Sequence, residues 1–115
     1  MTQTALFDPK PLLELEEDTS TQTMRTFAKG YLQDAPHKVQ ELEAALNQAD
    51  QAQVVKNAHD LKSSSAGVGL VELARVAKQM EASARIGQLK PVEILLKRNQ
   101  HLLEQSWHVL ANWLE

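Results

Sequence analysis

Apolar residues recur every three or four positions through residues 24–46, and this spacing constrains the fold more than any other feature of the chain. Met24, Ala28, Tyr31, Ala35, Val39, Leu42 and Leu46 form one such stripe, which is the pattern of one face of an α-helix. Pro36 lies inside the stripe, where proline removes a backbone donor and costs about 3 kcal/mol in a regular helix. Because the stripe stays in phase on both sides of Pro36, we predict one long helix kinked near this residue. Two helices meeting at residues 34–36 are the alternative.

Similar stripes and capping residues predict four further helices. Their predicted bounds are a short helix from about Pro9 to Glu17, a helix from about Gln51 to Gly67, one from about Leu70 to Gly87, and a last one from Pro91 through Leu114. The predicted core faces of the last three are Val54, Ala58, Leu61, Ser65 and Val68; Leu70, Leu73, Ala77, Met80 and Ala84; and Leu96, Leu103, Trp107, Leu110 and Leu114. Short connections between four substantial helices imply an all-α, antiparallel, up-and-down four-helix bundle with an additional short N-terminal helix.

Length and composition agree with this fold and exclude several classes of function. A chain of 115 residues suits one domain, with residues 1–18 as an N-terminal segment and 19–115 as the bundle. The absence of cysteine excludes disulfides and thiolate metal sites. A net charge of −3, without any basic block, argues against nucleic-acid binding. No leader pattern or membrane-length apolar run is present, so we expect a cytoplasmic protein that does not enter a membrane.

His59 is the residue that helical phase singles out. It lies roughly 150° from the centre of the predicted core face of its helix, taking ~100° per residue, so it should face water. Lys62 follows one turn later, at a spacing that lets its ammonium reach a group attached to the imidazole. The neighbours on this outward face are small or short, so another protein could approach the imidazole closely; they are Ala52, Val55, Ser63, Ala66 and Gly67.

An exposed imidazole beside a lysine can carry a phosphoryl group. Free imidazoles have a pKa of about 6.5, so a large fraction is neutral at pH 7 and has one ring nitrogen free as a nucleophile. A phosphoryl group adds nearly two negative charges, about as much as phosphoserine, which Lys62 would partly offset. A lone His-x-x-Lys pair is nevertheless an ordinary surface feature, and the longer pattern decides between the two interpretations.

That longer pattern resembles the histidine-containing phosphotransfer (HPt) domains of bacterial two-component phosphorelays. The family motif reads His-x-Leu-Lys-Gly-small-small, with Gly-Leu or Gly-Ala ten residues after the histidine. The matching residues here are His59, Leu61, Lys62, Ser64, Ser65, Gly69 and Leu70, and the similarity extends through Phe27, Tyr31, Leu32, Asp34, Ala35 and Pro36 before the motif and Leu73, Met80 and Glu81 after it. Ser63 departs from the pattern, because it stands where the family has glycine, and this affects how closely a partner can dock.

The resemblance implies a phosphotransfer intermediate rather than an ATP-dependent kinase, and the initiating Met1 and single-domain length lead us to expect a stand-alone protein. His59 would accept a phosphoryl group from the aspartyl phosphate of a receiver domain and relay it to another receiver, with Lys62 as the second catalytic residue. The implied partners are receiver domains of response regulators and a hybrid sensor histidine kinase. Mg²⁺ is expected on the receiver, and this chain, which we expect to be a monomer, needs no cofactor or metal of its own. A fragment of a larger hybrid kinase would have the same sequence features.

The predicted docking surface combines the outward face around His59 with the N-terminal helix. Its residues are Ala52, Val55, Lys56, Ser63, Ala66, Gly67, Leu12 and Leu13. For the two leucines we keep two interpretations, since the N-terminal helix of the family often lies beside the histidine but could also merely cover one end of the bundle.

Two other classes of function remain as alternatives. A non-catalytic helical adaptor could bind a signalling partner through the same exposed face, and Ser63 is the feature that favours it. A metal-binding bundle is the weaker alternative. His101 and His108 lie ~10 Å apart along a helix, and His37 with Glu41 lacks a third ligand.

Overall fold

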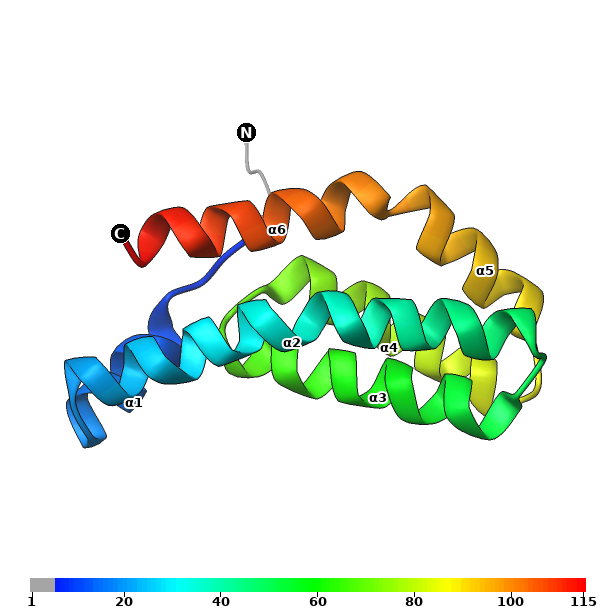
Figure 1. Ribbon diagram of the computed structural model, residues 1–115, viewed down its shortest axis with the longest axis horizontal. Coiled ribbons are helices and arrows are strands. Elements are labelled where there is room, and N and C mark those ends of the chain that lie inside the picture. Colours follow the sequence, from blue (N-terminus) through cyan, green and yellow to red (C-terminus); the bar gives the residue numbers. More distant parts are fainter. Residues whose placement is uncertain (1–5) are drawn as a thin grey trace.

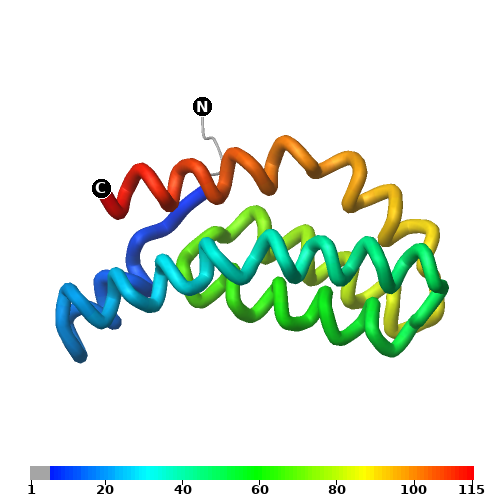
Figure 2. The backbone as a smooth tube through the Cα atoms, viewed as in Figure 1, coloured from blue at the N-terminus to red at the C-terminus, as the bar shows by residue number. Residues whose placement is uncertain are grey.

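The structure, a computed structural model, describes residues 6–115, and in that range it contains six helices and no strand (Figure 1). The helices are α1 (Lys10–Asp18), α2 (Thr21–Asn47), α3 (Gln51–Gly67), α4 (Val71–Arg85), α5 (Leu89–Arg98) and α6 (Gln100–Trp113). The chain runs up α2, down α3 and up α4, and then returns along the bundle through α5 and α6 (Figure 2). The all-α fold with a short additional N-terminal helix is therefore confirmed.

Helix α2 is continuous through Pro36, so the alternative of two helices is wrong. The Ser20 side chain caps its start by accepting the backbone N–H of Thr23 at 3.0 Å. Val39 and Leu42, which follow Pro36, are buried in the core. Burying a large apolar side chain contributes about 1.5–3 kcal/mol, so these two residues can offset the cost of the proline. At the end of the stripe the structure buries Ala45 and only partly covers Leu46.

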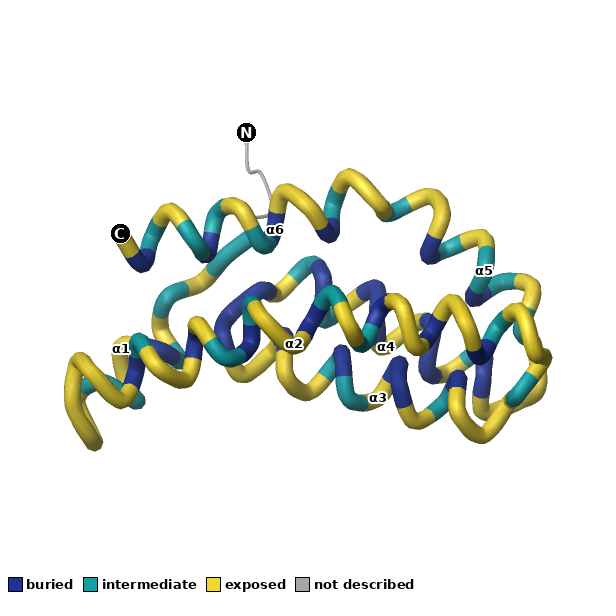
Figure 3. Tube along the Cα trace, in the orientation of Figure 1, coloured by how far each residue is buried: buried dark blue, intermediate teal, exposed yellow. Residues whose placement is uncertain are grey.

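The inward faces of α3 and α4 are those that the spacing predicts (Figure 3). All ten residues predicted for these two faces are at most 1% exposed. The Asp50 side chain caps α3 by accepting the backbone N–H of Gln53 at 3.2 Å. Gly87 follows the end of α4 with a φ of 77°, the left-handed conformation expected of a glycine after a helix.

The prediction of a single last helix is wrong, because the chain breaks into α5 and α6 at Asn99 (Figure 1). The Asn99 side-chain amide donates to the Leu95 carbonyl at 2.8 Å, and its backbone N–H donates to the same carbonyl at 3.1 Å. Asparagine side chains compete with backbone N–H groups for helical carbonyls, and the Asn99 amide ends α5 in this way. The break keeps Leu96 and Leu103, on either side of it, in the same core.

The turn between α3 and α4 is held by the segment that precedes α1. Gly69 has a φ of 82°, and its carbonyl accepts the backbone N–H of Asp8 at 2.8 Å. A Cβ atom on Gly69 would lie 1.9 Å from the Asp8 carbonyl oxygen, which is not possible without movement of the backbone. Phe7 packs edge-on against Trp113 with 5.3 Å between ring centroids, so the same segment also contacts the end of α6.

We predict that Gly69→Ala destabilises the protein by on the order of 2 kcal/mol, because alanine disfavours a positive φ and its Cβ would collide with Asp8. The measurement is the free energy of unfolding in urea. Gly30→Ala is the matched control, since a Cβ there meets nothing within 4 Å and a helix interior favours alanine by up to ~1 kcal/mol. Equal stability of Gly69→Ala and the unsubstituted protein would contradict the assignment of this contact.

Candidate functional site

His59 lies in the middle of α3 with 49% of its side chain exposed, as helical phase predicts. Its Nδ1 atom is 3.0 Å from Oε2 of Glu81 on α4. A carboxylate can only accept a hydrogen bond, so Nδ1 is the protonated nitrogen. In the neutral imidazole, Nε2 then carries the free lone pair, and it makes no hydrogen bond within residues 6–115. The contact with Glu81 therefore fixes both the tautomer and the orientation of the ring.

Glu81 is the buried centre of this site. Its side chain is 6% exposed, and Oε1 accepts Lys62 Nζ at 2.6 Å. Oε2 accepts Arg85 Nη2 at 2.6 Å in addition to the bond from His59. The hydrogen bond from Lys62, followed by those from Arg85 and His59, outweighs burial and lowers the pKa of Glu81 from 4.5 to about 2. Glu81 is therefore a carboxylate throughout the neutral range.

Glu81 and Arg85 are site residues that helical phase and the family motif did not single out. A usable signal was present, since Glu81 follows Ala77 by four residues and precedes Ala84 by three, which places a carboxylate on the apolar stripe of α4. A charged side chain on a core stripe needs a partner of opposite charge. Arg85 lies one turn further along α4 and supplies part of that charge.

Lys62 occupies the predicted position beside His59, but its ammonium is directed at Glu81. Its side chain is 32% exposed, so it is partly covered rather than free in solvent. Lys62 and His59 thus bind the two oxygens of one carboxylate. In this arrangement Lys62 neutralises the carboxylate that orients the imidazole.

Most of the predicted docking residues lie on the exposed face around His59. Ala52, Lys56, Ser63, Ala66 and Gly67 are exposed, whereas Val55 is partly buried against the core. Lys56 also forms an ion pair with Asp60 at 3.2 Å. Gly69 and Leu70, which support the motif, are buried in the turn after α3.

The two leucines of α1 separate into different roles. Leu13 is 46% exposed and can belong to a docking surface. Leu12 is fully buried in the core, so its prediction as a docking residue is wrong. The physical reason is that α1 packs against α2, and this packing covers the face that carries Leu12.

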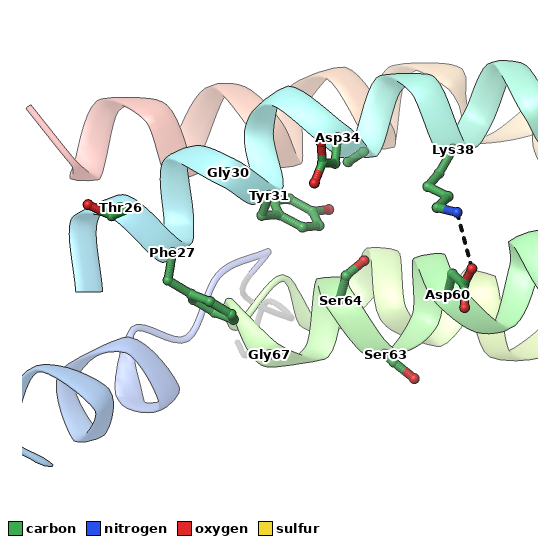
Figure 4. A pocket seen from close by; sticks show the side chains of 11 residues that line it. Thr26, Phe27, Gly30, Tyr31, Asp34, Lys38, Asp60, Ser63, Ser64 and Gly67 are labelled. Atoms are coloured by element: carbon green, nitrogen blue, oxygen red, sulfur yellow. Dashed lines mark hydrogen bonds and ion pairs between the residues drawn. The ribbon is translucent and has the colours of Figure 1, made fainter. Parts of the chain in front are cut away.

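A groove of about 450 Å³ lies between α2 and α3, next to the exposed face of α3 (Figure 4). Phe27, which the docking prediction missed, is 48% exposed at one end of the groove. A Cβ on Gly67 would lie 3.6 Å from its ring, so the two residues form adjoining surface. At the other end Lys38 pairs with Asp60 at 3.2 Å.

Tyr31 lines the same groove and connects three helices. Its hydroxyl is 2.8 Å from Ser65 Oγ on α3 and accepts the indole N–H of Trp107 on α6 at 3.1 Å. Burial raises the pKa of Tyr31, so the hydroxyl stays protonated. This hydrogen-bonded chain fixes the side of α3 that faces away from solvent.

Within residues 6–115, no group of three or more histidine, aspartate or glutamate side chains is placed to hold a metal ion. His37, His101 and His108 are exposed, and His108 is hydrogen-bonded to Asn112. Across the same residues, every helix is too short or too polar to span a bilayer.

This helical bundle presents an oriented, half-exposed imidazole, and the comparisons with known proteins show its class, the phosphotransfer proteins of two-component systems. The family model of the Hpt domain matches residues 27–113, so the chain belongs to the Hpt domain family. No curated protein sequence matches the chain. Among solved structures, it is similar to histidine-containing phosphotransfer protein B (HptB) from Pseudomonas aeruginosa PAO1, with a TM-score of 0.88, 23% identity, and coverage of 97% of this chain and 96% of that chain.

The lowered pKa of Glu81 predicts how stability depends on pH. Below about pH 4.5 the Glu81 carboxyl is protonated in the unfolded chain, whereas in the folded protein it stays ionised down to about pH 2. The stabilising contribution of this group is therefore lost as the pH falls toward 2. We expect a loss on the order of 1 kcal/mol, because the long side chains that cover Glu81 leave it near solvent. Urea unfolding between pH 5 and 3 measures this change.

Glu81→Gln should flatten that pH dependence, whereas Glu17→Gln on α1 should leave it unchanged. Glu17 is exposed and forms no ion pair within residues 6–115. An identical pH slope in Glu81→Gln and the unsubstituted protein would show that the carboxylate is not held as described.

Proposed function

We propose that Nε2 of His59 accepts a phosphoryl group from the aspartyl phosphate of a receiver domain and passes it to the aspartate of another receiver. The observation that carries this proposal is the 3.0 Å contact between Nδ1 and Glu81, which leaves the opposite nitrogen free on an exposed face. Membership of the Hpt domain family supports it. The hybrid sensor kinase and the response regulators that would supply these receivers belong to the same proposal.

The geometry supports a reversible transfer. The Nε2 lone pair forms a bond to phosphorus while the bond from phosphorus to the aspartyl oxygen breaks, and that electron pair leaves with the carboxylate. His59 keeps its Nδ1 proton and becomes a cation, which ionised Glu81 balances at 3.0 Å. In the second transfer the carboxylate of the next receiver attacks phosphorus, and the P–N electron pair returns to Nε2. Because the Nδ1 proton is retained, the ring departs as neutral imidazole rather than as an imidazolate anion, and this better leaving group favours onward transfer.

Glu81 acts in this scheme as a positioning residue, because it holds the imidazole without contacting the phosphoryl group. Phosphoryl transfer depends mainly on alignment and on neutralising charge. We propose that Mg²⁺ and the acidic pocket around it are supplied by the receiver, while this chain supplies the aligned nitrogen and the cations near it.

The receiver would dock on the exposed face of α3 and on the groove beside it. Ser63, Ala66 and Gly67 have small side chains or none, so little protrudes from the surface around His59. Phe27 and Leu13 add exposed apolar surface at its edge. Ser63, which replaces the family's glycine, lines the groove, and Figure 4 shows its hydroxyl pointing away from α2. This residue therefore lies where the groove meets the exposed face of α3.

We predict that His59→Gln abolishes phosphorylation by a phosphorylated receiver, because glutamine has no nucleophilic ring nitrogen. The measurement is the acid-labile, base-stable phosphoryl label on this chain after incubation with the receiver. His101→Gln, which changes another exposed histidine, should keep the full label. A full label on His59→Gln would refute the assignment. Receiver binding without any label on the unsubstituted protein would support the non-catalytic adaptor instead.

We predict that Phe27→Ala weakens receiver binding about tenfold, the ~1.4 kcal/mol typical of losing a well-packed aromatic contact. Titration calorimetry with the receiver measures the dissociation constant, and circular dichroism verifies the fold. Ile94→Ala is the matched control, since Ile94 is 43% exposed on α5 and does not line the groove. Equal weakening by both substitutions would place the docking surface elsewhere.

A further inference from the structure

A second cleft lies between α3 and α4, on the other side of α3 from the groove. It has a volume of about 220 Å³, and its lining comprises Lys62, Lys78, Glu81, Ala82 and Arg85. Residues 78, 81, 82 and 85 follow the spacing of one helical face, so α4 presents them together. Three of the five lining side chains are cationic and one is anionic, which leaves an excess of two positive charges.

The positions along the two helices place Lys78 near the imidazole. Helices α3 and α4 are antiparallel about the turn at residues 68–70, and Glu81 contacts both His59 and Lys62. Lys78 lies one helical turn before Glu81 in α4, and Lys62 lies one helical turn after His59 in α3. Both lysines are therefore displaced in the same direction, toward the connection at residues 68–70. Lys78 therefore lies across from Lys62, one helical turn from the level of the imidazole.

The three cations of the cleft differ in what they already bind. Lys62 holds Oε1 of Glu81 at 2.6 Å, and Arg85 holds Oε2 at 2.6 Å. If either turned toward a phosphoryl group, a buried carboxylate would lose a partner, which is strongly unfavourable. Lys78 is exposed and forms no ion pair within residues 6–115. Among the described residues it can therefore reorient without breaking an ion pair.

We propose that Lys78 is the cation that binds the phosphoryl group on Nε2 of His59, while Lys62 remains on Glu81 and acts through it. This proposal rests on the proposed function of His59 as a phosphoryl carrier. A phosphoryl group brings about 1.5–2 negative charges, which matches the excess positive charge of the cleft. A lysine suits this task, since its flexible stem lets three N–H donors follow the group. The reassignment changes the role that the sequence alone gave to Lys62.

The test loads His59 with phosphoramidate, a small phosphoryl donor that modifies imidazoles without a protein partner. The ³¹P resonance of phosphorylated His59 is assigned by its loss in His59→Gln, and its shift is followed against pH. A bound cation favours the dianionic phosphoryl group, so Lys78→Ala should raise the phosphoryl pKa by about half a unit or more. Lys78→Arg should restore the original value.

Lys29→Ala is the matched control, because Lys29 is an exposed residue of α2 that lines neither the groove nor the cleft. A phosphoryl pKa that is the same in Lys78→Ala, Lys29→Ala and the unsubstituted protein would overturn the proposal. A second arm measures the equilibrium with a phosphorylated receiver, which Lys78→Ala should shift several-fold away from His59.

The two arms separate this proposal from the proposed function. If phosphoramidate labels His59 but no receiver does, the relay fails, and the ³¹P titration still decides the role of Lys78. If the receiver labels His59 and Lys78→Ala changes neither the titration nor the equilibrium, the relay stands and Lys78 is excluded. Failure of both donors to label His59 would overturn both proposals.

Discussion

The antiparallel register of α3 against α4 is the constraint on which the site depends. His59 and Glu81 are separated by 22 residues, and the turn between their helices brings Nδ1 and Oε2 to 3.0 Å. A change of one residue in the length of that turn would rotate Glu81 by ~100° away from the imidazole. Gly69 fixes the turn with its positive φ and its contact with Asp8. A backbone feature about ten residues from the imidazole in sequence thus determines which imidazole nitrogen is free.

The same network links stability with chemistry. A buried carboxylate is costly unless donors surround it, and Glu81 meets this requirement with an ammonium, a guanidinium and an imidazole. Because the imidazole is one of the donors, satisfying Glu81 also orients His59 and keeps the proton on Nδ1. The two lysines of the cleft therefore differ in what they bind. Lys62 belongs to the buried network, whereas Lys78 lies at its edge and forms no ion pair within residues 6–115.

Helical periodicity predicts which face of each helix is buried, because burial depends on an average over many residues. It therefore located the core faces of α3 and α4 and the exposure of His59 correctly. It missed the break at Asn99, where a single side chain competes for one helical carbonyl and leaves the apolar spacing unchanged. It also missed the contacts of Glu81. These contacts depend on how α3 is aligned against α4, which the apolar spacing within a single helix does not determine. Phe27 was detectable as an aromatic residue off the core stripe of α2.

The surroundings of His59 are asymmetric, and this asymmetry bears on how a partner can approach. On the α2 side lies a groove edged by exposed Phe27, whose charged end is neutralised internally by Lys38 and Asp60. On the α4 side lies a cleft with an excess of positive charge. In the proposed relay, a receiver whose acidic pocket faced the groove would lose the electrostatic attraction and leave the apolar edge uncovered. In the opposite orientation the acidic pocket faces the positively charged cleft and the apolar edge at Phe27 is covered. In the proposed complex, charge and apolar surface therefore favour the same approach to Nε2.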